Sequence, residues 1–290
     1  MKEIIYYAQN REDLIISSFF PDIKNGFYID VGAADPVEDS VTKYFYEKGW
    51  SGVNIEPIKS LYKKLNKSRK RDLNLNIGIS SSPGRLTLRE YENYGISTFS
   101  STSKKENVTD KFTDYEVEVQ TLEQIFETIK GKKVNFLKVD VEGYEYEVLE
   151  GNDWDKFRPE LICVESNHRH RDWRPLLEDN NYQKVFFDGL NDYYLANESR
   201  GRFKVFRKIY PELLISRPIV GYSWKKLIEK TEGQLEKVQA NLDSHIDLNE
   251  RMEVVNRHLE DELGKFQKVG YTTKHLLKLG RDKMKRSKRI

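Results

Sequence analysis

Short apolar runs alternate with segments of helical periodicity between Gly26 and Ala196, and this alternation restricts the fold more than any other feature of the sequence. The runs are rich in β-branched and aromatic residues, as strands are, while apolar residues recur three or four positions apart in the segments between them. Strands that alternate with helices build an α/β fold with a doubly wound, mostly parallel sheet. Seven strands are expected, at residues 26–31, 52–57, 73–79, 134–139, 161–165, 183–187 and 193–196.

Two parts of this region depart from the simple alternation. The last two strands are joined by the turn-rich residues 188–191, which predict a hairpin and therefore an antiparallel strand at one edge of the sheet. Residues 80–115 are polar and rich in Ser and Thr, and they predict a β-meander with a loop that covers the site.

Composition narrows the class of protein further. Hydrophobic residues make up 38% of the 290 residues, which is enough for one main core and excludes intrinsic disorder throughout. The only cysteine, Cys163, lies in an apolar run, so we expect a buried structural thiol and no disulfide framework. Residues Met1–Tyr7 lack the apolar stretch of a signal peptide, and no window approaches a membrane span, so we expect a cytoplasmic protein.

Acidic residues stand where the first predicted strands end. Asp30 and Gly32 close the first strand, and Glu56 closes the second. Ligands of open parallel sheets bind outside the carboxyl ends of the strands, where an acidic side chain can accept the two hydroxyl groups of a ribose. Because the glycine-rich phosphate cradle of dinucleotide enzymes is missing, the pattern favours a nucleoside without phosphates. Taken singly, each of these residues also fits a turn or a surface carboxylate.

A second acidic group follows the apolar strand 134–139. Asp140 and Glu142 lie two positions apart and point the same way on a strand, although an N-cap and a surface acid are the alternative. The next strand delivers Glu165 and then His168, an imidazole that can act as a general base toward a hydroxyl or simply lie on the surface. A divalent metal on the three carboxylates could do the same work, but the sequence does not demand one and we assign no metal ligand.

Five motifs follow one another in chain order: AQNREDL at 8–14, FYIDVGAADP at 27–36, NIEP at 54–57, GIST at 95–98 and FLKVDVEG at 136–143. Together they resemble the FkbM family of S-adenosylmethionine-dependent methyltransferases, over the span from Tyr7 to Ala196. Ala34 and Ala8 depart from the commoner family pattern, where Asn and Ser are frequent, so polar contacts near the cofactor can differ.

The resemblance implies a Rossmann-like class I methyltransferase that uses S-adenosylmethionine and transfers its methyl group to an oxygen. The acceptor implied is a sugar hydroxyl, on a natural product or on a polysaccharide such as an O-antigen. By the same resemblance, Asp30 and Gly32 line the methionine part of the cofactor and Glu56 holds the ribose. Asn76 and Ile77 would flank the adenine.

The predicted site therefore has two sets of residues. The expected cofactor-binding set is Gln9, Asp30, Gly32, Ala33, Glu56, Asn76, Ile77 and Asp140. The expected catalytic set is His168, Asp140 and Glu142, with His168 preferred as the base that takes the proton of the acceptor hydroxyl.

Two other functional classes stay open. One is a different nucleoside or dinucleotide enzyme, such as a short oxidoreductase, which the missing phosphate-cradling glycines disfavour. The other is a catalytically silent Rossmann-like scaffold that dimerises through its C-terminal helix, which the joint presence of Asp30, Glu56, Asp140 and Glu142 disfavours.

The C-terminal third is expected to be a separate helical element. Heptad positions run from Trp224 to Phe266 without a proline, as in a coiled coil. Asn249 and Asn256 occupy a positions, where asparagine specifies a parallel pair of helices, so we expect a homodimer. A helix packed back on its own domain is the alternative. The expected division is a methyltransferase domain at 1–205, a connector at 206–223, a coiled-coil helix at 224–270 and a basic tail at 271–290.

The net charge of +2 is unevenly distributed along the chain. From Lys265 to Arg289 nearly every charged residue is Lys or Arg, so the chain has a basic tail. Basic residues beside an apolar cluster can hold a protein on anionic lipid, which predicts peripheral contact with the inner face of the membrane; a solvated tail is the alternative. No recognition motif accompanies the charge, so nucleic acid is not an expected partner.

Overall fold

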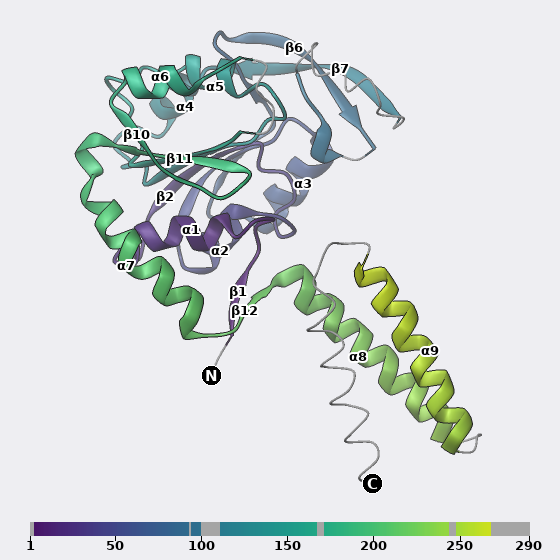
Figure 1. Cartoon of the computed structure of the whole chain (residues 1–290). Coiled ribbons are helices and arrows are strands. Elements are labelled where there is room, and N and C mark those ends of the chain that lie inside the picture. Colours follow the sequence, from purple (N-terminus) through teal and green to yellow (C-terminus); the bar gives the residue numbers. More distant parts are fainter. Residues whose placement is uncertain (1–2, 93, 100–110, 167–170, 244–247, 268–290) are drawn as a thin grey trace. The chain divides into compact units, whose positions relative to one another are not determined.

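The computed structural model in Figure 1 describes residues 3–92, 94–99, 111–166, 171–243 and 248–267. Contacts between residues divide the chain into two units, Met1–Tyr222 and Ser223–Ile290. The first unit contains the sheet, and the second is helical where it is described.

A seven-stranded sheet in the order β10-β11-β9-β8-β2-β3-β4 forms the centre of the first unit. Strand β11 is antiparallel to both of its neighbours, and the other pairs are parallel. The expected mostly parallel sheet with an antiparallel strand near one edge is therefore confirmed. The strands are β2 (Phe27–Val31), β3 (Ser51–Ile55), β4 (Leu73–Leu75), β8 (Phe136–Val139), β9 (Leu161–Glu165), β10 (Tyr182–Phe187) and β11 (Asn191–Ala196).

Helices cover both faces of this sheet because its central strands are apolar on both sides. Along β2, Ile29 packs into a core on one face and Tyr28 into a core on the other. The first core includes residues of α4 (Leu122–Thr128), α5 (Glu145–Glu150) and α6 (Arg174–Asp179). The second includes residues of α1 (Glu12–Phe19), α2 (Val41–Glu47) and α7 (Gly201–Ser216), which lie on the opposite side of the sheet in Figure 1.

A small second sheet, in the order β5-β7-β6, stands beside the main one. The expected strand 73–79 is split between the two sheets, because β4 ends at Leu75 and β5 pairs with β7. The expected β-meander is present as an antiparallel pair followed in the chain by α4, and α3 (Lys59–Ser68) connects β3 to β4. The elements are β5 (Gly78–Ile79), β6 (Gly84–Tyr91), a 3₁₀ turn (Tyr94–Ile96) and β7 (Phe112–Gln120). Most of the loop expected to cover the site, at 100–110, lies outside the described residues.

The segment expected to be a connector, 206–223, is instead built into the first unit. Helix α7 runs through Pro211 to Ser216, and strand β12 (Ile219–Gly221) pairs in parallel with β1 (Ile4–Tyr6). The reason is an aromatic stripe at helical spacing on α7, formed by Phe203, Phe206 and Tyr210. Phe206 stacks on Phe19 of α1 with ring centroids 4.2 Å apart. Pro211 removes one backbone hydrogen-bond donor from the helix. Burial of the aromatic stripe outweighs this loss, so the helix continues through the proline.

The second unit contains two described helices, α8 (Tyr222–Asp243), which begins one residue before the unit, and α9 (Leu248–Gln267). Residues 244–247, which interrupt the expected coiled-coil helix, and the basic tail at 271–290 lie outside the described residues. One continuous coiled-coil helix, and the homodimer built on it, therefore stay predictions. None of the helices in the described part of the chain is both long and apolar enough to cross a membrane.

The packing of α7 gives a testable prediction. Phe206 is 4% exposed, so replacing it by alanine should remove about 3 to 5 kcal/mol from the free energy of unfolding of the first unit. Denaturation by urea, followed by tryptophan fluorescence, measures the change. Lys208→Ala, an exposed substitution on the same helix, should stay within about 0.5 kcal/mol of the wild type. Equal losses in both variants would contradict the role given to the aromatic stripe.

Candidate active site

A cavity of about 480 Å³ lies at the carboxyl ends of the central strands. Strand β2 has β3 on one side and β8 on the other, although β8 follows far later in the chain. A change of direction of this kind opens a crevice in doubly wound sheets. Side chains and backbone from each of these strand ends line the cavity: Gly32, Ala33, Glu56, Asp140, Glu142 and Glu165.

Gly32 fixes the floor of this cavity. Its φ of +79° lies in the left-handed region, and a Cβ at this position would meet the carbonyl oxygen of Asp140 at 1.9 Å. The N–H groups of Gly32 and Ala33 both donate to the carbonyl of Ile55 at 3.1 Å. Only glycine therefore allows the ends of β2, β3 and β8 to approach this closely.

Glu56 is a buried carboxylate on the wall of the cavity, with 3% of its surface exposed. One oxygen accepts a hydrogen bond from the Ala34 N–H at 2.8 Å, and the other accepts one from the Ile58 N–H at 2.7 Å. These bonds fix the orientation of the side chain. Burial raises the pKa of Glu56 to about 7, so its charge changes near neutral pH.

A buried lysine, Lys138, lies in the lining of the cavity. Lys138 Nζ is 3.5 Å from Asp30 and 3.3 Å from Asp140, and it donates to the carbonyl of Gly32 at 3.0 Å. Burial alone would lower the pKa of Lys138, but the charges of Asp140 and Asp30 raise it above its ordinary value. The ammonium group therefore stays charged. The predicted site omitted Lys138. A lysine inside the apolar run FLKV is the signal that could have found it, because a buried cation needs carboxylate partners.

Asp30, another of the expected cofactor residues, is buried within the sheet. It is 1% exposed and does not line the cavity. One carboxylate oxygen accepts a hydrogen bond from the Thr42 hydroxyl at 2.9 Å, and the other faces Lys138. Asp30 is thus placed to orient Lys138, and contact with a ligand stays a prediction.

Three carboxylates meet at the mouth of the cavity. Ligand oxygens of Asp140, Glu142 and Glu165 all lie within 4.8 Å of one another. Glu142 has a φ of +55°, unusual for a residue with a side chain. Burial, followed by the negative charges of Asp140 and Glu142, raises the pKa of Glu165 to about 9. The three acidic residues expected from the sequence are therefore brought together.

The two residues expected to flank an adenine do not line the cavity. The Asn76 amide donates to the carbonyls of Glu56 and Pro57 at 2.9 and 2.8 Å, and Ile77 packs in the core. Gly78 and Ile79 of β5 line the cavity instead, since the chain leaves the main sheet after β4. The adenine-binding role of Asn76 and Ile77 stays a prediction.

Two further residues complete the comparison with the sequence. His168, the preferred base, lies in 167–170, outside the described residues. Gln9 lines the cavity as expected, together with Glu12, which the predicted site omitted. Glu12 accepts hydrogen bonds from the Asn10 N–H at 2.7 Å and the Asn191 amide at 3.1 Å. Burial raises the pKa of Glu12 to about 7; its place in the first motif was the signal that could have found it.

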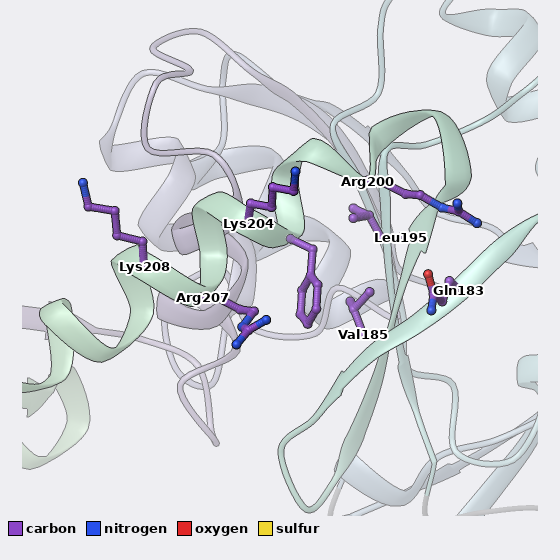
Figure 2. A pocket seen from close by; sticks show the side chains of 8 residues that line it. Gln183, Val185, Leu195, Arg200, Lys204, Arg207 and Lys208 are labelled. Carbon is purple, nitrogen blue, oxygen red and sulfur yellow. The ribbon is translucent and has the colours of Figure 1, made fainter.

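Figure 2 shows a second hollow, of about 550 Å³, between α7 and the strands β10 and β11. Its polar lining consists of cations and one amide: Arg200, Lys204, Arg207, Lys208 and Gln183. Leu195 in its wall pairs with Leu161, the first residue of β9, so this hollow lies at the amino ends of the parallel strands. The carboxylates that end the strands are therefore remote from it, and the candidate site is the first cavity.

The comparison with protein families agrees with the motifs. The model of the methyltransferase FkbM domain family matches residues 30–184. No curated protein matches the sequence. Among solved structures, a candidate tRNA (m1A22) methyltransferase of Streptococcus pneumoniae is 14% identical, with 86% of this chain and 95% of that chain covered and a TM-score of 0.37. A Streptococcus agalactiae protein of the NADB-Rossmann superfamily is 13% identical, with 89% and 96% covered and a TM-score of 0.38.

The close approach at Gly32 yields the second prediction. Gly32→Ala places a methyl group in the left-handed region against a backbone carbonyl, which should cost about 2 to 5 kcal/mol of the free energy of unfolding. Gly201→Ala is the matched control, because nothing lies within 4 Å of its added Cβ. Urea denaturation of both variants measures the difference. A Gly32→Ala protein as stable as the control would show that the strand ends tolerate separation.

Proposed function

This chain belongs to the FkbM family of S-adenosylmethionine-dependent methyltransferases, and we propose that it methylates a hydroxyl group of a sugar or polysaccharide. The observation that carries the proposal is the position of the carboxylate group Asp140, Glu142 and Glu165 at the mouth of the cavity that also contains Glu56. When bound, S-adenosylmethionine supplies an electrophilic methyl group on a positively charged sulfur.

The residues of the cavity fit this cofactor. Its volume lies within the range of about 300 to 1,000 Å³ that is usual for small-molecule sites. The fixed carboxylate of Glu56 suits the hydroxyl groups of a ribose, and the glycine at position 32 leaves the backbone accessible. We assign the ribose to Glu56 and the methionine part to Gln9, Gly32 and Ala33, which all line the cavity. The excess of carboxylates favours a cationic ligand.

Methylation of a hydroxyl needs an acceptor that is positioned in line and loses its proton. We propose that Asp140 and Glu142, which line the cavity, accept a hydrogen bond from the acceptor hydroxyl. Lys138 also lines the cavity and contacts Asp140 at 3.3 Å, and so restricts the direction in which this carboxylate points. His168 lies outside the described part of the chain, so its role as the base stays a proposal.

The charge of the mouth supports a neutral, hydroxyl-rich acceptor. Carboxylates accept hydrogen bonds from hydroxyl groups, whereas a phosphorylated or acidic acceptor would meet like charge. The catalytically silent scaffold is the second candidate. A scaffold has no need of three mutually repelling carboxylates at a ligand cavity, so the same observation disfavours it.

The acceptor class can be tested by methyl transfer from radiolabelled S-adenosylmethionine to a panel of oligosaccharides. Neutral oligosaccharides should be labelled, and the same oligosaccharides carrying a phosphate should be poorer acceptors. Glu142→Gln should abolish labelling while the protein still binds the cofactor. Labelling of a protein, nucleic acid or phosphorylated sugar in preference to all neutral glycans would refute the proposed acceptor.

Binding of the cofactor should depend on pH through Glu56. Its folded pKa is about 7, so the carboxylate that accepts ribose hydroxyls is ionised above this pH and protonated below it. Affinity for S-adenosylhomocysteine should therefore fall by up to about tenfold per pH unit below 7, the limit for one linked proton. Calorimetric titrations between pH 5.5 and 8.5 measure the slope. Glu56→Gln should bind weakly with a flat profile; a slope equal to that of the wild type would contradict the assignment.

Partners and location rest on the sequence and are proposed here on that basis. A parallel coiled coil through residues 224–270 would make the enzyme a homodimer in the cytoplasm. The basic tail would hold it on anionic lipid, near a surface glycan made at the membrane. In this arrangement the helix sets the distance between the active site and the lipid.

A further inference from the structure

Three carboxyl groups, of Asp140, Glu142 and Glu165, lie close together in the lining of the cavity. Lys138 is the cation that contacts Asp140, and it also faces Asp30. Among the described residues, no ion pair to a lysine or arginine involves Glu165. Three carboxylates with oxygens within 4.8 Å of one another repel strongly unless a proton or a cation lies between them.

A second, independent observation concerns one oxygen of Glu165. The side chain is 8% exposed, and its Oε2 atom is buried without a hydrogen-bond partner in the described part of the chain. Leaving a buried polar acceptor unsatisfied destabilises the folded protein. The atom belongs to a side chain that lines the cavity beside Asp140 and Glu142. A ligand that supplies positive charge at this point would satisfy it.

From this geometry we propose that Asp140, Glu142 and Glu165 bind a divalent cation. The cation extends the proposed function, because the role given to it below rests on methylation of a hydroxyl. All three ligands are carboxylates, and no nitrogen or sulfur ligand joins them among the described residues. Oxygen-only sites suit hard cations, so the expected ion is Mg²⁺ or Mn²⁺.

The position of the site explains what the cation contributes. Asp140 and Glu142 follow β8, and Glu165 ends β9, so two neighbouring strands hold the ligands on one side of the ion. The side toward the cavity stays open to water or to the acceptor hydroxyl. An oxygen bound to the cation has a lowered pKa and a fixed direction. Lys138 remains necessary, because it holds Asp140 in place from the side of the sheet.

Mn²⁺ binding to the full-length chain tests this site without any methyl transfer. The protein is freed of metal with a chelator and titrated with Mn²⁺, and the free ion is followed by electron paramagnetic resonance. We expect one Mn²⁺ per chain, displaced by Mg²⁺. Glu165→Gln and Glu142→Gln should each weaken binding by at least about tenfold, the lower range for loss of groups that support a metal. Glu127→Gln, an exposed change of the same kind on α4, should bind as the wild type does.

Two further measurements separate loss of the cation site from misfolding and from failure of the proposed function. Thermal unfolding without metal should show Glu165→Gln at least as stable as the wild type, because an uncharged amide costs less to bury than a carboxylate, so weak binding would not reflect misfolding. Absence of saturable Mn²⁺ binding, or equal binding by wild type and Glu165→Gln, would overturn the cation site and leave a shared proton as the explanation. Binding of S-adenosylhomocysteine in the presence of chelator tests the proposed function separately, since the cofactor assignment does not depend on the metal.

Discussion

The ammonium group of Lys138 lies where three strand ends meet, and the architecture of the site depends on it. From the middle of β8 it faces Asp30 of β2 and Asp140 at 3.5 and 3.3 Å, and it donates to the carbonyl of Gly32. A buried charge without partners is costly, so the loss of either carboxylate would leave the charge of Lys138 poorly compensated. These contacts bring the carbonyl of Gly32 and the carboxylate of Asp140 to the same cation in the lining of the cavity.

The remaining charge of the site follows from this arrangement. Lys138 offsets the acids at the floor, while Glu56 on one wall and Glu165 at the mouth are buried carboxylates whose pKa values are raised to about 7 and about 9. The cavity therefore prefers ligands that bring hydroxyl groups or positive charge. A nucleoside sulfonium at the wall and a cation with a hydroxyl acceptor at the mouth satisfy both preferences. The hollow beneath α7 has the opposite charge and lies at the opposite edge of the sheet.

The sequence predicted those parts of the site that depend on where strands end. Parallel strands end at one edge, so Glu56, Asp140 and Glu165 had to come close together, and they do. The cavity lining beyond β4 depends on where the chain leaves the sheet, which no local pattern marks, and there β5 places Gly78 and Ile79 in the lining. Helix α7 was missed for a similar reason. A connector was expected at 206–223, whereas tertiary packing of Phe206 maintains a helix that runs through Pro211.

A crystal structure of the protein with S-adenosylhomocysteine tests the central claim most directly, because it locates the nucleoside relative to the strand ends. The account predicts ribose hydroxyls within hydrogen-bond distance of the Glu56 carboxylate, with the sulfur facing the group formed by Asp140, Glu142 and Glu165. A nucleoside bound elsewhere, for example in the hollow beneath α7, with Glu56 contacting only the Ala34 and Ile58 N–H groups, would contradict it.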